Sequence, residues 1–328
     1  MILVLSYNTY EQCTDPVIEW LRFYKAEYIK VNIQDLITKN QRYVVNPTKK
    51  EIIIDGVNYY NKINVVWNRR FRNKLNFVGN LKDSLSRQLN AESNSEIETL
   101  SDYLRYLLKD KVWSPQEDIY FENKLVLHQI AKECGLLVPE KRIINNKSDL
   151  LKFYNESENG LISKPMAYSG YYIKDDITYL MYTIDYDLEM INQLDDFFFP
   201  TLFQEKVVAD YEIRNFYNDG EHYPTAILLD KTNRALDIKL NYTAKRINWN
   251  TYSLPEEVKQ QLNLFMTKAN LNTGSIDLIK DISGKYFFIE VNPAGQFLAP
   301  SKRCNYNIEK IIAEWLIKKD KQETYEKV

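Results

Sequence analysis

Three candidate oxygen ligands for a metal ion lie in the segment GSIDLIKDISGKYFFIEVNPAGQF, toward the C-terminal end of the chain. They are Asp277, Glu290 and Asn292, on two apolar runs joined by Ser283 and Gly284. A two-residue hairpin loop suits that pair, because glycine tolerates the positive φ of such turns. This loop would place Asp277 opposite Glu290, and side chains alternate with period two along a strand. We therefore expect all three side chains on one face of one sheet.

Two carboxylates and an amide suit Mg²⁺, a hard cation that usually keeps phosphates or waters as its remaining ligands. The neighbouring residues, in SIDLI and FFIE, are mostly apolar. Carboxylates among them are costly unless something pairs with them. An exposed polar face on a half-buried sheet would give the same pattern, so the pattern alone leaves both interpretations open.

The composition is that of an ordinary globular protein, with 45% hydrophobic and 27% charged residues among 328. The formal net charge of -2 does not favour nucleic acid or an acidic membrane surface as a partner. The three cysteines are far apart and indicate neither a disulfide framework nor a zinc motif. The opening MILVLS is expected to be a strand and not a signal peptide, and no apolar run is long enough to span a bilayer. These features favour a cytoplasmic protein.

The N-terminal third alternates strands and helices. Strands are expected at residues 2–6, 28–32 and 63–67, with a helix that begins near Asp15 and Pro16. This order predicts a small open sheet covered by helices.

A basic cluster, Asn68, Arg69, Arg70 and Arg72, follows the strand that ends at Trp67. Strand ends in open α/β sheets are where ligands tend to bind. A solvated run of charge is the alternative interpretation.

The remaining residues predict two further α+β units. A helix is expected to begin after Asn123 and to end at Gly135. Further strands are expected at residues 142–144, 161–164, 201–208, 211–217 and 225–230, and further helices at 256–268 and 308–318. The predicted domains are residues 1–113, 114–200 and 201–328.

Four features occur in one order along the chain: Asn123-Lys124 at a helix start, Lys164 at a strand end, the stretch QEKV, and the C-terminal hairpin. In this order the sequence resembles ATP-grasp enzymes. More narrowly it resembles the graspetide (microviridin-type) maturases that cross-link ribosomally made precursor peptides, in the grasp-with-spasm branch. The resemblance covers essentially the whole chain and is carried by MILVLSYNTYEQ, VWNRRF, NTGSIDLI, GKYFFIEVNPAGQF and CNYNIEK. Neither GxxxxGK[ST] nor GxGxxG occurs.

The resemblance implies an α/β ATP-grasp fold with ATP and Mg²⁺ as cofactors. It implies an N-terminal open-sheet domain (1–113), a central subdomain with a mobile phosphate-covering loop, AYSGYY (114–200), and a C-terminal subdomain with the metal site (201–328). The implied roles are phosphate binding by Lys124, Lys164 and Arg214; adenine binding by the backbone of Gln204, Glu205, Lys206 and Val207; ribose binding by Asp210, with Glu212 as the next candidate; and magnesium binding by Asp277, Glu290 and Asn292.

The sequence departs from the pattern of the family after Asp230. Relatives commonly carry an Asp-aromatic-Arg motif where this chain has Asp237, Ile238 and Lys239. Lysine is not equivalent to arginine for bidentate contacts with carboxylate or phosphate. The resemblance therefore does not extend to the substrate contacts at this position, and Arg246 is the other basic candidate.

ATP is strongly negative, so a peptide that brings carboxylates next to it needs compensating cations in the part of the site that binds the peptide. Lys239, Lys245 and Arg246 are expected to supply them, with Arg69 and Arg70 as weaker candidates. A solvated charged loop is the alternative interpretation of the segment LDIKLNYTAKRINW.

The chemistry that the resemblance implies begins with attack of a substrate side-chain carboxylate on the γ-phosphate of ATP. A Ser/Thr hydroxyl or a Lys amine of the same peptide then displaces phosphate from the acyl phosphate and closes an ω-ester or ω-amide macrocycle. Neither His128 nor His222 belongs to an evident ligand set or nucleophile triad, and this chemistry needs none. The implied partners are the precursor peptide, with a leader and an acidic Thr/Ser-containing core, and a second copy of the chain in a homodimer.

Two other functions remain open. One is an ATP-grasp ligase that acts on free amino acids or on a protein C-terminus. The other is a non-catalytic nucleotide- or peptide-binding relative.

Overall fold

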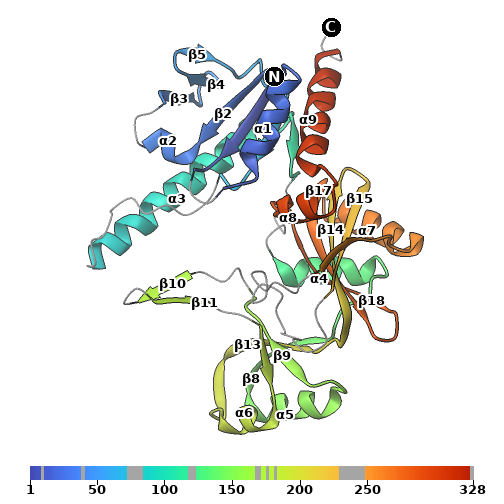
Figure 1. Cartoon of the computed structure of the whole chain (residues 1–328). Coiled ribbons are helices and arrows are strands. Elements are labelled where there is room, and N and C mark those ends of the chain that lie inside the picture. The colour runs from blue at the N-terminus through green and yellow to red at the C-terminus, as the bar shows by residue number, and fades with distance from the viewer. Residues whose placement is uncertain are drawn as a thin grey trace. The chain divides into compact units, whose positions relative to one another are not determined.

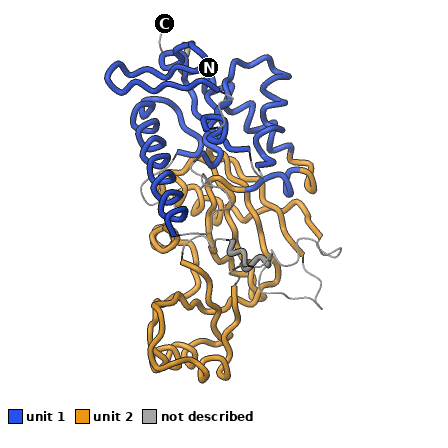
Figure 2. Tube along the Cα trace, turned by 90° about the vertical axis from the view of Figure 1, so that its left-hand side faces the viewer, with its two compact units in different colours: residues 1–117, 296–301, 307–328 blue, residues 118–295, 302–306 orange. Residues whose placement is uncertain are grey.

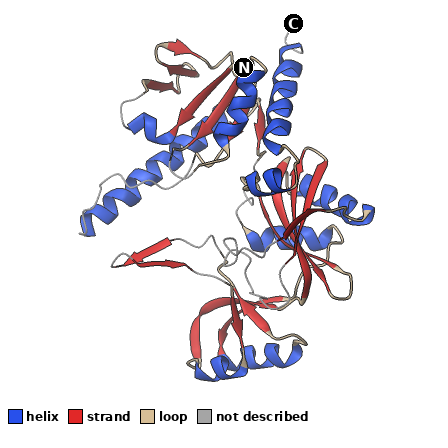
Figure 3. Cartoon of the chain, in the orientation of Figure 1, coloured by secondary structure: helices blue, strands red, loops and turns tan. Residues whose placement is uncertain are grey.

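The computed structural model describes residues 1–8, 11–37, 41–71, 84–116, 123–166, 171–174, 177–180, 183–228 and 248–325. These residues form a mixed α/β structure with several separate sheets (Figure 1, Figure 3). The chain divides into unit 1, residues 1–117, 296–301 and 307–328, and unit 2, residues 118–295 and 302–306 (Figure 2). Among the described helices, none combines the length and the apolar composition that crossing a bilayer requires.

Unit 1 is built on a four-stranded parallel sheet, as the sequence predicts. Its strand order is β2 (Tyr28–Asn32), β1 (Ile2–Ser6), β6 (Val65–Asn68) and β7 (Val112–Ser114). Helix α9 (Ile308–Tyr325) contacts α1 (Thr14–Phe23), β1 and β6. Helix α3 (Ser84–Leu107) shares a core with β1 through Leu104 and Leu3. Because both faces of the sheet are covered, every residue of β1 is buried.

Smaller elements complete unit 1. They are helix α2 (Ile33–Ile37) and an antiparallel sheet of β3 (Tyr43–Asn46), β4 (Glu51–Ile54) and β5 (Val57–Asn58).

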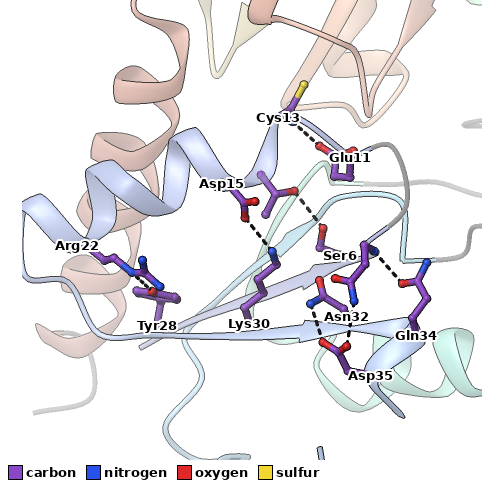
Figure 4. A network of polar contacts seen from close by, with 12 residues as sticks. Ser6, Glu11, Cys13, Asp15, Arg22, Tyr28, Lys30, Asn32, Gln34 and Asp35 are labelled. Atoms are coloured by element: carbon purple, nitrogen blue, oxygen red, sulfur yellow. Dashed lines mark hydrogen bonds and ion pairs between the residues drawn. The ribbon is translucent and has the colours of Figure 1, made fainter. Parts of the chain in front are cut away.

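Polar side chains bond one another at the carboxyl ends of β1 and β2 (Figure 4). The amides of Asn8 and Asn32 both donate to the Asp35 carboxylate, at 2.9 and 2.7 Å. The hydroxyls of Ser6 and Thr14 are 3.0 Å apart. These contacts fix the loops at the edge of the sheet where open α/β folds bind ligands.

The end of the chain packs on the first strands of unit 1. The Met1 amine pairs with the Asp320 carboxylate, and the Asn64 amide donates to the same carboxylate at 2.8 Å. Helix α9 therefore belongs to unit 1, although the division predicted from the sequence assigns it to the C-terminal domain. The three-domain division itself stays a prediction.

The first large sheet of unit 2 is antiparallel. Its strand order is β12 (Ile184–Tyr186), β9 (Leu161–Ser163), β13 (Phe197–Glu205) and β8 (Lys141–Asn146). Helices α5 (Lys147–Glu156) and α6 (Leu188–Gln193) bury one face through a core that includes Phe153, Ile191 and Phe203. A separate hairpin consists of β10 (Tyr171–Lys174) and β11 (Ile177–Leu180).

The second large sheet of unit 2 has five antiparallel strands. Their order is β16 (Asn248–Thr251), β15 (Glu221–Leu228), β14 (Ala209–Asn218), β17 (Thr273–Asp281) and β18 (Tyr286–Asn292). Helices α4 (Lys124–Glu133) and α7 (Glu256–Lys268) share a core with Ile213, Leu278 and Phe288 of this sheet. Since side chains alternate, Arg214, Asp277 and their neighbours on the same face are left for other roles. The short helix α8 (Leu298–Arg303) follows β18.

The β17–β18 hairpin has the predicted pairing but not the predicted loop. Asp277 pairs with Glu290, and Ser275 pairs with Asn292. The loop has three residues, not two, because Asp281 donates its backbone N–H to the Lys285 carbonyl at 2.9 Å. A β-bulge between the Asp277 and Leu278 pairs shifts the register of β18 by one residue. The longer loop and the bulge cancel, so Asp277 still faces Glu290.

Candidate active site

Arg214 and Asp277 form a bidentate ion pair on the face of the five-stranded sheet away from its helices. They are directly paired residues of β14 and β17. The Arg214 Nε and Nη2 atoms donate to the two carboxylate oxygens of Asp277, each at 2.9 Å. An ionised carboxylate has about four lone-pair sites, so Asp277 can accept this arginine and still bind a metal ion.

Glu290, the second predicted metal ligand, pairs with the first predicted phosphate lysine. The Lys124 Nζ atom donates to Glu290 Oε2 at 2.9 Å. Lys124 opens helix α4, and the Asn123 side chain caps that helix by accepting from the backbone N–H groups of Leu125 and Val126. Because α4 packs against β18, this capped helix end is held near the metal ligands.

Asn292 ends β18 at a tight turn. The backbone N–H of Gly295 donates to the Asn292 carbonyl at 2.9 Å. A Cβ atom at Gly295 would lie 2.5 Å from Ser275 Oγ and 2.7 Å from the Asn292 carbonyl oxygen. Only glycine therefore fits where the turn crosses Ser275, the cross-strand partner of Asn292.

The three predicted metal ligands thus share one sheet face. Asp277 and Glu290 are cross-strand partners, and Asn292 is two residues beyond Glu290 on the same strand. The described residues hold no cluster of three or more His, Cys, Asp and Glu suited to a metal. Here the donor set is two carboxylates and one amide, whose oxygens fit Mg²⁺.

The predicted adenine-binding stretch begins at the end of β13. Gln204 is 2% exposed, and its Oε1 atom has no hydrogen-bond partner among the described residues. The backbone N–H groups of Glu205 and Lys206 bond to the carbonyls of Glu140 and Gly160, and Lys206 pairs with Asp185 at 2.5 Å. Val207 follows directly. These four residues, 204–207, are called the hinge below. Backbone hydrogen bonds from the hinge fix it to the neighbouring segments.

The two candidate ribose ligands differ in position. Asp210 lies at a bulge of β14, and its carboxylate is 3.9 Å from the Lys280 amine. Glu212 is two residues before Arg214 on a regular part of the strand, and it pairs with Ile279, two residues after Asp277. Glu212 therefore shares the face of Arg214 and Asp277.

Two residues that the sequence analysis did not assign to the site, Lys141 and His128, lie close to it. The Lys141 Nζ atom is 2.7 Å from His128 Nδ1 and 2.6 Å from Nε2. Burial lowers the pKa of Lys141 to about 6, with the Lys164 charge acting in the same direction. Burial also lowers the pKa of His128 to about 3, as do the charges of Lys141 and Lys164. His128 was detectable in the sequence, because it lies four residues after Lys124 on one helix.

The arginines after β6 lie in unit 1. Arg69 is 3% exposed, and its Nη2 atom is 3.4 Å from the Glu11 carboxylate. Arg70 donates to the Tyr7 hydroxyl at 3.4 Å. For Arg69 the interpretation as a solvated charge is wrong, because the side chain is buried.

Other predicted residues fall outside the described part of the chain. They are Arg72, Gly170 with part of the AYSGYY loop, Asp237, Ile238, Lys239, Lys245 and Arg246.

No protein-family model matches the sequence, and no curated protein matches it either. Solved structures match along nearly the whole chain. The macrocyclase MdnC bound with precursor peptide MdnA, from Microcystis aeruginosa MRC, has a TM-score of 0.81 and 23% identity, with 97% of this chain and 99% of that chain covered. A Chryseobacterium gregarium RiPP-associated ATP-grasp ligase, in complex with ADP and a leader and core peptide, has a TM-score of 0.78 and 20% identity, with 97% of each chain covered.

Two further structures define the fold. The ATP-grasp ligase PsnB, complexed with a minimal precursor, Mg and ADP, has a TM-score of 0.76 and 18% identity, with 97% of each chain covered. The D-alanine–D-alanine ligase from Bacillus anthracis has a TM-score of 0.52 and 13% identity, with 100% of this chain and 99% of that chain covered. These likenesses confirm the fold that the sequence predicts: the chain has the ATP-grasp fold.

Proposed function

We propose that the chain is an ATP-dependent ligase that cross-links a ribosomally made precursor peptide. It would activate Asp or Glu side chains as acyl phosphates and close ω-ester or ω-amide rings with Thr, Ser or Lys side chains. The observation that carries the proposal is the sheet face with Asp277, Glu290 and Asn292, to which Arg214 and Lys124 are paired. The likeness to peptide-bound MdnC and PsnB supports the substrate class.

Asp277, Glu290 and Asn292 are the proposed ligands of Mg²⁺, which when bound would neutralise charge on the phosphates. Lys124, Lys164 and Arg214 are the proposed phosphate-binding cations. For ribose we propose Glu212 in preference to Asp210, because it shares the face of Arg214. The hinge, Gln204, Glu205, Lys206 and Val207, would bind adenine.

The residues of the chain would act by charge and position. In the first step a carboxylate oxygen of the peptide forms a bond to the γ-phosphorus, and the bond from phosphorus to ADP breaks. In the second step a hydroxyl or amine attacks the acyl carbon, loses its proton, and phosphate leaves. Arg214, Lys124 and Lys164 would stabilise the negative charge that moves through both steps. No covalent enzyme nucleophile is needed.

Binding of the acidic core peptide requires cations beyond the nucleotide site. Lys239 and Arg246 are our candidates, with Arg69 and Arg70 of unit 1 as weaker ones. Arg69 is the least suited of these, because its charge is already paired with Glu11.

The proposed partners are the precursor peptide and a second copy of the chain in a homodimer. We place the reaction in the cytoplasm, where ribosomal peptides and ATP are both present.

A ligase that acts on free amino acids or on a protein C-terminus is the second candidate. The likeness to a D-alanine–D-alanine ligase favours it, but that TM-score is 0.52 against 0.81 for MdnC. The complete set of oxygen ligands argues against a non-catalytic role.

The test is to incubate the protein with a candidate precursor peptide that has an acidic, Thr/Ser-containing core, together with ATP and Mg²⁺, and to measure the mass of the peptide. We expect the mass of the peptide to fall by one water for each ring closed, and one ADP to be formed for each ring. Glu290→Gln serves as the inactive control. An unmodified acidic peptide, with ATP consumed only when free amino acids are added, would support the second candidate instead.

A further inference from the structure

Lys141 lies in a row of side chains on the helix-free face of the first large sheet of unit 2. Gln204 of β13 is paired with Lys141 of β8 on one side and with Ile162 of β9 on the other. Cross-strand partners point to the same face, and that face is opposite to Phe203 and its core. Lys141 is therefore the cross-strand neighbour of Gln204, whose buried amide oxygen has no hydrogen-bond partner in the described part of the chain.

The charges around the Lys141 amine are mostly positive. Lys164 and Lys124 both lower its pKa, and Glu290 is the carboxylate that raises it. Glu290 is already paired with Lys124 at 2.9 Å. No carboxylate lies within 4.0 Å of the Lys141 amine among the described residues. Of the charged side chains that act most on the Lys141 amine, two are lysines and one is a carboxylate, and this balance at a partly buried amine favours the binding of an anion.

The imidazole of His128 contacts the Lys141 amine but carries no negative charge that could balance the charge of the protonated amine. A carbonyl oxygen only accepts, so the His128 Nε2 atom, 2.5 Å from the Ile289 carbonyl, must carry the ring proton. The Lys141 amine lies 2.7 Å from Nδ1 and 2.6 Å from Nε2, and of these two ring nitrogens only the unprotonated Nδ1 can accept from it. Ile289 lies at the bulge of β18. The ring thus joins Lys141 to the strand that carries Glu290.

We propose that Lys141 is a third lysine of the nucleotide site, that it binds the phosphate chain of ATP together with Lys124 and Lys164, and that His128 positions it. The proposal rests on the nucleotide-dependent function proposed above. Phosphate binding would give Lys141 a role at a position where, without an anion, burial and the nearby lysines both oppose ionisation of its amine.

The first test replaces Lys141 by methionine, which keeps the length and removes the charge. We expect Lys141→Met to weaken ATP and ADP binding by about tenfold or more and to leave adenosine binding unchanged, as measured by calorimetry. Without nucleotide the melting temperature should rise, because a poorly solvated amine is removed. Lys132→Met, on the exposed side of α4, is the matched control and should change none of these values.

The second test concerns His128. His128→Ala should reproduce part of the loss of ADP affinity. His128→Gln should restore it, because an amide can both donate to the Ile289 carbonyl and accept from Lys141.

Wild-type ADP affinity in Lys141→Met would overturn the proposal. So would a lower melting temperature with equal losses for ADP and adenosine, which is the behaviour of a structural lysine. The test is separable from that of the proposed function. A wild-type protein that binds ADP but never cyclises the peptide would contradict that function and leave this inference standing, whereas one that binds no nucleotide would overturn both.

Discussion

Arg214 and Asp277 face each other across β14 and β17, and the guanidinium binds both carboxylate oxygens at 2.9 Å. A bidentate pair fixes the plane of the carboxylate as well as its distance. Arg214 therefore orients the proposed metal ligand and brings a cation to the same point. One arginine can in this way serve both the metal and the phosphates.

Arg214→Ala should lower turnover strongly and stability weakly. The two side chains are 18% and 26% exposed, and a pair of this kind contributes about 1 kcal/mol or less to the free energy of unfolding. In turnover, the loss of a charge-assisted contact corresponds to about tenfold or more. Urea unfolding and an ADP-release assay measure the two effects. Arg142→Ala, which removes an exposed pair with Glu156, should leave turnover unchanged; equal losses in both variants would contradict the assigned role.

Removal of one charge from the proposed metal site should abolish turnover while the fold survives. Asp277→Asn and Glu290→Gln change little volume, so circular dichroism should match the wild type. Chelation of Mg²⁺ should have the same effect on the wild type, and added Mg²⁺ should reverse it. Full turnover in both variants would refute the site.

The sequence predicted those parts of the site that depend on local pattern. The alternation of side chains around Asp277 and Glu290 correctly predicted that the two residues share a sheet face. The predicted hairpin loop was one residue too short. A bulge at Ile289 of β18 compensates for that residue, so the pairing of Asp277 with Glu290 is the one predicted. Hydrophobic pattern cannot show such a bulge, because it depends on the partner strand.

Contacts between distant segments could not be predicted from pattern. The contact between Lys141 and His128 depends on the pairing of β8 with β13. The ion pair between Met1 and Asp320 joins residues from opposite ends of the chain. Arg69 resembles a surface charge until the burial of its partner Glu11 is known.

Gly295→Ala should impair both stability and turnover. The new methyl group would lie 2.5 Å from Ser275 Oγ and 2.7 Å from the Asn292 carbonyl, so the turn that carries Asn292 must move. Such overpacking costs about 1–3 kcal/mol. Gly284→Ala, where a Cβ meets nothing within 4 Å but φ is +89°, should cost about 1 kcal/mol with turnover retained. Turnover equal to wild type in Gly295→Ala would show that the Asn292 turn is not needed.

The free energy of unfolding should rise with pH above neutrality because of Lys141. Its pKa is about 6 in the folded protein against 10.5 for an ordinary lysine. Between these values the unfolded chain binds a proton that the folded protein does not, so stability increases as pH rises. The slope for one proton is at most about 1.4 kcal/mol per pH unit. Urea unfolding of wild type and Lys141→Met at several pH values should show the variant more stable near pH 7 and the difference shrinking with pH; parallel profiles would contradict the lowered pKa.

In the proposed function ATP activates side-chain carboxylates of a peptide, so one carboxylate oxygen must be transferred to phosphate. The precursor peptide is made with ¹⁸O in its Asp and Glu carboxylates and incubated with the protein, ATP and Mg²⁺. We expect one labelled oxygen in inorganic phosphate and one ADP for each ring closed, because the oxygen that attacks the γ-phosphorus leaves with phosphate. Unlabelled phosphate beside a cyclised peptide, or AMP in place of ADP, would contradict it.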